Sequence, residues 1–413
     1  MKYSVDTRFQ SLADIIIRLN PVELVTPINV ADEKARWLDR AKIGLFTNPY
    51  FLYNREALKE ASSHNFELTA ARATLANGLI PETDAEKVIK KILLSRINNA
   101  ITVTEIAASI LLGDDNEVCD LSRKIYGFPS NSQAYRAYQI VNGEVIPYAK
   151  KSRFTKKDQK ALKAMQFDAE MIGYWFTEVI NHYGIDSWTI EVGDQFTSID
   201  VRDKNLTGRP LVGVPTTRKV NGLKLLELIG HEIECHLLGS ENCKELVQQI
   251  LGADSPLAPL FPVIAKSDDE LFYEGVAKIS DVSINGPEAL PMPYATIACD
   301  QARRGSDFAE IAKLIKDMRF DMGQTEEEAL KGAWTTTYRI MRGSTNTELG
   351  GYSFSKDYVY MGGYDIAQQV SPLFRNFASM TLDEITALAA VCELKPTYTN
   401  LDAVGYVKWQ LLS

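Results

Sequence analysis

Apolar residues recur at helical spacing through the first 150 residues, which predicts a mostly helical N-terminal region. Four segments carry this pattern most clearly: residues 12–19, 33–43, 83–97 and 104–112. A loop is predicted over residues 126–132, where Gly, Pro, Ser and Asn occur together. The short, polar and basic stretch 142–155 then marks a predicted boundary near residue 150.

The pattern changes after this boundary. Thr155 is expected to cap a long helix that runs to about residue 182. Alternating apolar residues then predict three short strands, over residues 188–192, 199–201 and 211–214. Pro210 and Pro215 bracket the third strand, which places it at a sheet edge. A largely apolar helix follows over residues 223–238, with Gly239 as its expected C-cap.

The last third of the chain returns to helical patterns. One helix is expected from Asp268 or Asp269 to residue 284, where an Asn-Gly-Pro sequence would stop it. The aromatic-rich residues 352–360 are predicted to form a strand. Two further helices are expected to begin with capping boxes, which pair Thr325 with Glu328 and Thr381 with Glu384.

The length of the chain indicates how many domains to expect, and its charge indicates which partners are unfavourable. At roughly 150 residues per domain, 413 residues suggest two or three packed units. The formal net charge is −9, from 45 basic and 54 acidic residues, which argues against a nucleic-acid partner because Lys and Arg make most phosphate contacts. No apolar run reaches 18 residues, so neither a spanning helix nor a membrane partner is expected.

Cysteine usage and the N-terminus indicate a location. The five cysteines are scattered and form no Cys-x-x-Cys motif, which favours reduced thiols in a cytoplasm over a disulfide framework. The first ten residues show no basic start followed by an apolar stretch, so no secretory signal is expected. We therefore expect a cytoplasmic protein.

Two of the four histidines lie close together, in the sequence Gly-His-Glu-Ile-Glu-Cys-His that ends at His236. A catalytic zinc needs three protein ligands and a nearby carboxylate that takes a proton from water. His231 and His236 are candidate ligands, and Glu232 is the candidate base. Their spacing of five residues puts the two histidines about 140° apart on a regular α-helix. The zinc hypothesis therefore predicts a local π-type turn, which would bring them onto one face.

Other interpretations of the motif stay open. Two histidines on one helix often bind no metal at all. Glu227 with His231, or Glu232 with His236, would be ligand pairs four residues apart that need no distortion. The apolar surroundings favour a metal, because a charged cluster there is unfavourable without a partner.

The motif resembles a known family. Together with residues 273–277 (Tyr-Glu-Gly-Val-Ala), it is similar to the H-E-x-x-x-H metallopeptidases related to microtubule-associated tyrosine carboxypeptidases. Bacterial relatives of this group carry the sequence Gln-Glu-Gly-Leu-Ala at the place of residues 273–277. Residues 48–53, 126–129 and 354–360 also look like family segments, so the resemblance spans roughly residues 20 to 370.

The resemblance implies a fold, a cofactor and a role for matching residues. It implies an α+β, zincin-like metallopeptidase with a small, mainly antiparallel sheet, with residues 1–150 as a helical N-terminal region and 151–413 as the catalytic domain. Zn²⁺ would be bound by His231, His236 and Glu274, with Glu232 as general base. Gly275 would let its helix approach the histidine helix. Without the resemblance, Glu274 would be interpreted as a solvated carboxylate paired with Lys278.

Four positions depart from the pattern of this family. Tyr273 and Val276 replace Gln and Leu, Gly239 stands where a basic residue is common, and Glu234 stands where a small residue is usual. Asn242 matches. These departures bear on substrate specificity more than on the metal site.

A carboxypeptidase also needs a cation that binds the terminal carboxylate. Arg339, Arg342 and Lys356 are the candidates, and Tyr360 or Tyr358 would donate a hydrogen bond to the developing oxyanion. Surface charge and an ordinary strand tyrosine are the alternative interpretations. The strand at 211–214, as an exposed edge, could bind an extended peptide by β-addition.

We therefore expect a zinc-dependent metallocarboxypeptidase that acts on the C-terminus of a peptide or protein. The alternatives are a zinc aminopeptidase or endopeptidase, or a non-catalytic binding protein that retains the fold. The sequence names neither the substrate nor the oligomeric state.

Overall fold

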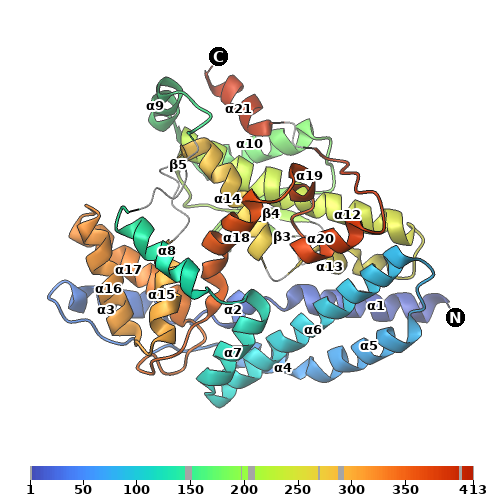
Figure 1. The fold of residues 1–413 in the computed structure, drawn as a ribbon, viewed down its shortest axis with the longest axis horizontal. Helices are drawn as coiled ribbons and strands as arrows, with labels where there is room; N and C mark the ends of the chain where they lie inside the picture. Colours follow the sequence, from blue (N-terminus) through green and yellow to red (C-terminus); the bar gives the residue numbers. More distant parts are fainter. Residues whose placement is uncertain are drawn as a thin grey trace.

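A computed structural model describes residues 2–144, 151–196, 198–202, 210–267, 270–286, 293–399 and 402–412. The chain is mostly helical with two small sheets, which agrees with the predicted α+β class (Figure 1). None of the described helices is both long and apolar enough to cross a membrane. All five cysteines are free thiols, as predicted.

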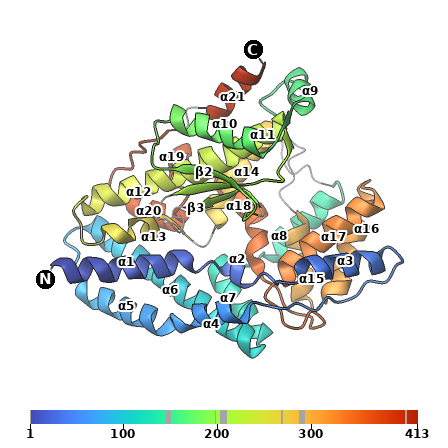
Figure 2. The same cartoon turned by 180° about the vertical axis from the view of Figure 1, so that it is seen from behind.

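The N-terminal region is helical as predicted, and its long helices lie along one side of the molecule (Figure 2). The segments 83–97 and 104–112 are parts of one helix, which begins with a capping box at Thr83 and ends at Gly113 with a φ of 73°. The helices of this region are α1 (Lys2–Arg18), α2 (Pro21–Leu24), α3 (Val30–Ala41), α4 (Arg55–Ser63), α5 (Asn65–Gly78), α6 (Asp84–Leu112), α7 (Asp115–Tyr126) and α8 (Asn131–Val141).

The predicted long helix over residues 155–182 is wrong. Thr155 caps a helix as expected, but this helix, α9 (Lys156–Ala164), is short. The strand β1 (Gln166–Phe167) then pairs with β5 (Val220–Asn221), and Asp168 caps a second helix, α10 (Ala169–His182). Strand pairing with a distant segment therefore interrupts a helical pattern that the local sequence could have continued.

The three predicted strands are present as β2 (Thr189–Gly193), β3 (Asp200–Arg202) and β4 (Leu211–Pro215). Their order is β2-β4-β3, so the expectation that β4 is an edge strand is wrong. Pro210 precedes the strand and Pro215 ends it, so neither removes a hydrogen bond from its middle. β2 pairs with β4 in a parallel direction, and β3 pairs with β4 in an antiparallel direction. This sheet is therefore mixed and not mainly antiparallel. With both edges of β4 paired, it cannot bind a peptide by β-addition.

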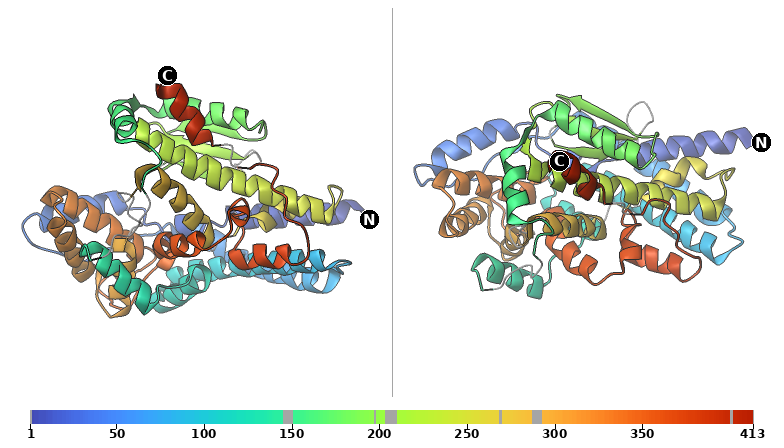
Figure 3. Two further views of the ribbon diagram at one scale, coloured as in Figure 1. Left: turned by 45° about the horizontal axis from the view of Figure 1, so that its top comes forward. Right: turned by 90° about the horizontal axis from the view of Figure 1, so that it is seen from above.

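The helix after the sheet is longer than predicted. It runs through α11 (Gly222–Leu228), η1 (Ile229–Leu237) and α12 (Leu238–Leu251) as one continuous rod (Figure 3). Gly239 is not its C-cap. The helix ends at Gly252, whose φ of 81° is a conformation that glycine adopts readily.

The remaining helices complete the molecule. The helix predicted to end near residue 284 is α14 (Leu271–Asn285), followed by Gly286 with a φ of 67°. Its predicted caps, Asp268 and Asp269, lie outside the described residues. The capping boxes at Thr325 and Thr381 are confirmed. The other helices are η2 (Ala258–Leu260), α13 (Phe261–Ala265), α15 (Pro293–Arg303), α16 (Phe308–Asp321), α17 (Glu326–Met341), η4 (Ser355–Tyr358), α18 (Val359–Gln368), α19 (Pro372–Arg375), α20 (Leu382–Ala389) and α21 (Ala403–Leu412).

The strand predicted over residues 352–360 is wrong. This segment holds the 3₁₀-helix η4 and the start of α18. Its side chains are buried from Tyr352 to Val359 without alternation. Where both faces are buried, an apolar run does not distinguish a strand from a helix.

Two hydrophobic cores meet at the histidine helix. The larger core joins the N-terminal helices to those after residue 235, for example through Trp37 and Trp334, whose ring centroids are 5.5 Å apart. The smaller core packs β4 and α10 against α11, η1 and α21. Helix η1 contributes Cys235 to the first core and Ile233 to the second, so it lies at their junction. The predicted division of the chain at residue 150 stays a prediction.

Candidate metal centre

The two clustered histidines lie on a π-helix, as the zinc hypothesis predicted. This helix, η1, extends over nine residues, which is longer than the single turn that was expected. A π-helix bonds residue i to residue i+5, so residues five apart come onto one face. The ring centroids of His231 and His236 are accordingly 4.8 Å apart, with the rings nearly perpendicular at 88°.

Three glycines set the distances between η1, α14 and α18. A Cβ on Gly230 would lie 2.1 Å from Ser280 Oγ, so Gly230 permits the close approach of η1 and α14. Gly275 was expected to serve this contact, but that expectation is wrong. A Cβ on Gly275 would lie 2.1 Å from the carbonyl oxygen of Gly363, so Gly275 lets α18 approach α14 from another direction.

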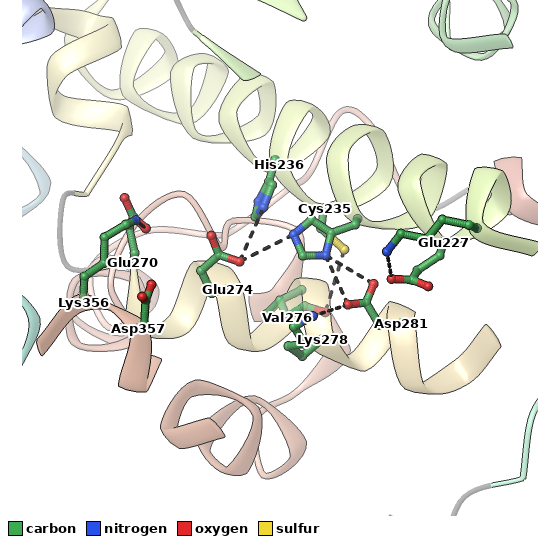
Figure 4. Close-up of polar contacts among 12 residues, drawn as sticks. Glu227, Cys235, His236, Glu270, Glu274, Val276, Lys278, Asp281, Lys356 and Asp357 are labelled. Carbon is green, nitrogen blue, oxygen red and sulfur yellow. Dashed lines mark hydrogen bonds and ion pairs between the residues drawn. The ribbon is translucent and has the colours of Figure 1, made fainter. Parts of the chain in front are cut away.

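Glu274 on α14 points at His236 (Figure 4), and it also forms an ion pair with His231. Its Oε2 lies 3.5 Å from His231 Nε2 and 3.9 Å from His236 Nε2. The Glu274 residue is only 8% exposed, and Oε2 has no hydrogen-bond partner within the described part of the chain. The structure therefore brings together the three residues that the resemblance implies as ligands.

The spacing of these atoms fits a tetrahedral zinc. Nitrogen and oxygen ligands at 2.0–2.1 Å from zinc lie roughly 3.3–3.4 Å from one another. The distance of 3.5 Å from Glu274 Oε2 to His231 Nε2 is close to this value, and the distance of 3.9 Å to His236 Nε2 is longer. A buried carboxylate oxygen without a donor is also unfavourable unless a cation or water binds it. Two imidazoles and one carboxylate are a donor set used by catalytic zinc sites.

Glu232 lies beside these donors. One donor atom from each of His231, Glu232 and His236 lies within 4.8 Å of the others. Burial raises the pKa of Glu232 to about 7, against the lowering effect of the nearby His231. This position suits either a metal ligand or a proton acceptor.

The charges of the site are strongly coupled. Burial raises the pKa of Glu274, but the two histidines outweigh it and hold that pKa at about 2. Burial lowers the pKa of His236 to about 3. Burial would also lower the pKa of His231, but the carboxylates of Asp281 and Glu232 raise it well above its usual value. His236 is thus neutral, which is the form that binds metals.

Two alternatives from the sequence fit less well. Glu227 forms an ion pair with Lys224, and its other oxygen accepts a hydrogen bond of 2.8 Å from Asn285, so both oxygens are engaged. The interpretation of Glu274 as a solvated partner of Lys278 is wrong. Glu274 is buried, and Lys278 instead lies 2.6 Å from Asp281.

Asp281 is a polar residue of the site that the sequence analysis missed. It is 2% exposed, and its Oδ1 lies 3.2 Å from His231 Nδ1. It follows Glu274 by seven residues on the same helix. Since residues seven apart share a helix face, this spacing is the signal that could have identified it.

Two positions that depart from the family pattern, and one that matches it, lie in different environments. Tyr273 stacks on His236, with ring centroids 3.7 Å apart, so it contacts the site directly. Glu234 accepts a hydrogen bond from the backbone N–H of Val404. Asn242 is buried in α12, where its side chain bonds to the backbones of Asn376 and Tyr398, so it holds the fold together.

The predicted substrate residues form two ion-pair groups next to α14. Arg339 lies 2.7 Å and Arg342 3.5 Å from Asp357 Oδ1. Lys356 pairs with Glu270, the residue before α14 (Figure 4). Lys356 was expected on a strand, but it lies in η4. The surface-charge interpretation therefore does not hold for Arg342, which is buried.

The two candidate tyrosines differ in their surroundings. The pKa of Tyr360 is raised well above its usual value, first by the charge of Glu274 and then by burial. The Tyr360 ring also lies 6.0 Å from the Arg339 guanidinium. The hydroxyl of Tyr358 instead packs against Gly127, where a Cβ would lie only 2.8 Å from it. Tyr360 is thus the tyrosine whose pKa responds to the charge of Glu274.

Comparison with known proteins adds one match. A family model described as microtubule-associated tyrosine carboxypeptidase matches residues 292–390. No curated protein matches the chain. The matched segment contains the candidate substrate residues and begins after α14, so it does not include the histidine motif. Over these residues the chain carries a domain similar to the microtubule-associated tyrosine carboxypeptidases.

Proposed function

We propose that this protein is a zinc-dependent metallopeptidase with a zincin-like fold, and that it removes a residue from the C-terminus of a peptide or protein. The observation that carries the proposal is the buried carboxylate of Glu274, placed between the Nε2 atoms of His231 and His236 without a hydrogen-bond donor among the described residues. The match of residues 292–390 to a carboxypeptidase family supports the type of reaction.

His231, His236 and Glu274 would hold the zinc. When bound there, zinc would supply Lewis-acid chemistry, which acidifies a water molecule and polarises the scissile carbonyl. Glu232 would accept a proton from the attacking water and pass it to the nitrogen of the leaving residue. The apolar packing of η1 between the two cores would limit access of other water molecules.

The substrate carboxylate would bind at Arg339. Its side chain is 28% exposed and lies beside Tyr360, whereas the side chain of Arg342 is 6% exposed and is covered by Asp357 and Phe354. Arg342 would therefore hold Asp357 in place, and Lys356 would act on Glu270 in the same way. Tyr360 would donate a hydrogen bond to the substrate oxygen that becomes negative. Tyrosine is the terminal residue that the family name offers for a first test.

The first experiment measures the metal content of the purified protein by mass spectrometry. We expect about one zinc per chain in the wild type and almost none in the double variant His231→Ala/His236→Ala. Glu274→Ala should also lower the zinc content. A wild type that binds no zinc after reconstitution would exclude the proposal.

The second experiment measures turnover with peptides that differ only at the C-terminus. A carboxypeptidase should cleave the free acid and leave the C-terminal amide intact. Cleavage of both forms would indicate an endopeptidase or an aminopeptidase instead. Glu232→Gln should keep the zinc and lower kcat by about 10²–10⁴-fold, because it removes the proton acceptor. Full activity of this variant would remove Glu232 from the mechanism.

The proposed location is the cytoplasm, where free thiols are maintained. It rests on the five free cysteines, four of which are buried.

A further inference from the structure

The two histidines of the candidate centre are held in different ways. His231 Nδ1 faces both oxygens of Asp281, at 3.2 and 3.4 Å, while its Nε2 faces Glu274. His236 Nδ1 is buried without a hydrogen-bond partner in the described residues, and its ring stacks on Tyr273. Only one of the two rings is therefore shown with a carboxylate behind it.

Asp281 is well placed to orient that ring. It is almost fully buried and lies two turns after Glu274 on α14, so one rigid helix carries both groups. Its other partner is Lys278, at 2.6 Å, and Figure 4 shows both residues further along α14 than Glu274 and farther from His236. Glu274 thus faces Nε2 of the His231 imidazole, and Asp281 faces its Nδ1.

We propose that Asp281 is a positioning residue for the metal. By accepting the hydrogen of Nδ1, it fixes the His231 tautomer in which the Nε2 lone pair points at the cation. A carboxylate behind a metal-binding histidine also makes the ring a stronger ligand. This inference rests on the proposed zinc site, and it assigns to Asp281 a share of the zinc affinity without any contact with the zinc.

The competing explanation is that Asp281 only stabilises α14 through its ion pair with Lys278. The two explanations make different predictions for Lys278. If the ion pair matters, Lys278→Met should weaken zinc binding as much as Asp281→Asn. If orientation of His231 matters, Lys278→Met should leave it nearly unchanged, because Asp281 still faces His231.

The test measures the zinc affinity of the full chain by competition with a chromophoric chelator. Asp281→Asn should bind zinc 10–100-fold more weakly than the wild type, which is the usual effect of removing such a carboxylate. Lys278→Met should stay within about threefold of the wild type. Circular dichroism and urea denaturation of the metal-free proteins check that each variant folds.

Two outcomes with a zinc-binding wild type would overturn the inference. One is an unchanged affinity in Asp281→Asn, and the other is an equal loss in both variants. A wild type that binds no zinc would instead overturn the proposed function, and the inference with it. The two failures are therefore distinguishable.

A measurement on the wild type covers the case in which Asp281→Asn does not fold. The chain has only four histidines, so ¹⁵N-histidine labelling gives a spectrum that single His variants can assign. With zinc bound, His231 should carry its hydrogen on Nδ1 and bind the metal through Nε2. The opposite tautomer would overturn the inference without any change at Asp281.

Discussion

Two carboxylates on different helices link distant parts of this protein, and they differ in how they are satisfied. Glu384 on α20 accepts two hydrogen bonds, of 2.6 and 2.7 Å, from the guanidinium of Arg96 on α6. It accepts a third hydrogen bond from the backbone N–H of Thr381. Glu274 on α14 faces two histidines, and its Oε2 has no donor within the described residues. Both carboxylates are largely shielded from water.

The difference separates a structural group from a candidate functional one. A buried acceptor without a donor costs roughly 1–3 kcal/mol, so a fold keeps it where a ligand compensates for the cost. Glu384 needs nothing beyond the chain itself. Glu274 Oε2 instead faces two histidine nitrogens without a hydrogen-bond partner among the described residues, and this arrangement is what distinguishes the site.

The largest expected effect concerns the satisfied pair. Arg96→Met should lower the free energy of unfolding by about 3–5 kcal/mol, because it leaves the shielded Glu384 carboxylate without its cation. Urea denaturation of the metal-free protein measures this change. The zinc stoichiometry of the folded variant should stay at the wild-type value, and a loss below about 1 kcal/mol would contradict the structural role of the pair.

Metal should act only on the unsatisfied site. At a free zinc concentration of 1,000 times Kd, the free energy of unfolding should rise by about 4 kcal/mol, because zinc binds the folded state. Thermal and urea denaturation with zinc or with a chelator measure this rise. Arg96→Met should gain as much as the wild type, and His231→Ala/His236→Ala should gain almost nothing. A gain in the double variant would place the stabilising zinc elsewhere.

The next largest expected effect concerns the contact between α14 and α18. A Cβ on Gly363 would lie 1.9 Å from the carbonyl oxygen of Leu271, so Gly363→Ala should force α18 away from α14. We expect a loss of about 1–3 kcal/mol in stability, together with weaker zinc binding, because α14 carries Glu274. The control is Gly78→Ala at the end of α5, where no atom lies within 4 Å of the new Cβ. Equal stability of the two variants would contradict the close contact.

The smallest effect sharpens the description of Glu384. Thr381→Ala removes a capping box whose glutamate also pairs with Arg96, whereas Thr325→Ala removes one whose glutamate is exposed. Each should cost about 1 kcal/mol in urea denaturation, because each removes one side-chain cap. A much larger loss for Thr381→Ala would mean that Glu384 depends on its cap, and not mainly on Arg96, for its orientation.

Local signals in the sequence predicted local structure well. The capping boxes at Thr325 and Thr381 and the π distortion at His231 are confirmed, because each depends on residues within one or two turns. The position of Glu274 beside the histidines came from the family resemblance. Spacing alone favoured a solvated carboxylate, since nothing local shows that α14 packs against η1.

Features that depend on distant segments were predicted wrongly. The prolines around β4 suggested an edge strand, but β3 pairs with its second side, and no local signal shows which strands become neighbours. Gly275 was assigned to the wrong neighbour, because a glycine shows that a close approach exists without showing which helix makes it. Residues 352–360 were assigned to a strand since burial on all sides removes the periodicity that would distinguish a strand from a helix.

The π-helix has a consequence for the far end of the chain. Relative to the common zinc motif with histidines four residues apart, this helix contains one inserted residue. Glu234, between the two histidines, accepts a hydrogen bond from the backbone N–H of Val404 in the first turn of α21, where helices leave N–H groups without partners. A deletion between His231 and His236 would restore the common spacing but would shift the register of this anchor. The π-helix that aligns the two histidines thus also anchors α21 through Glu234.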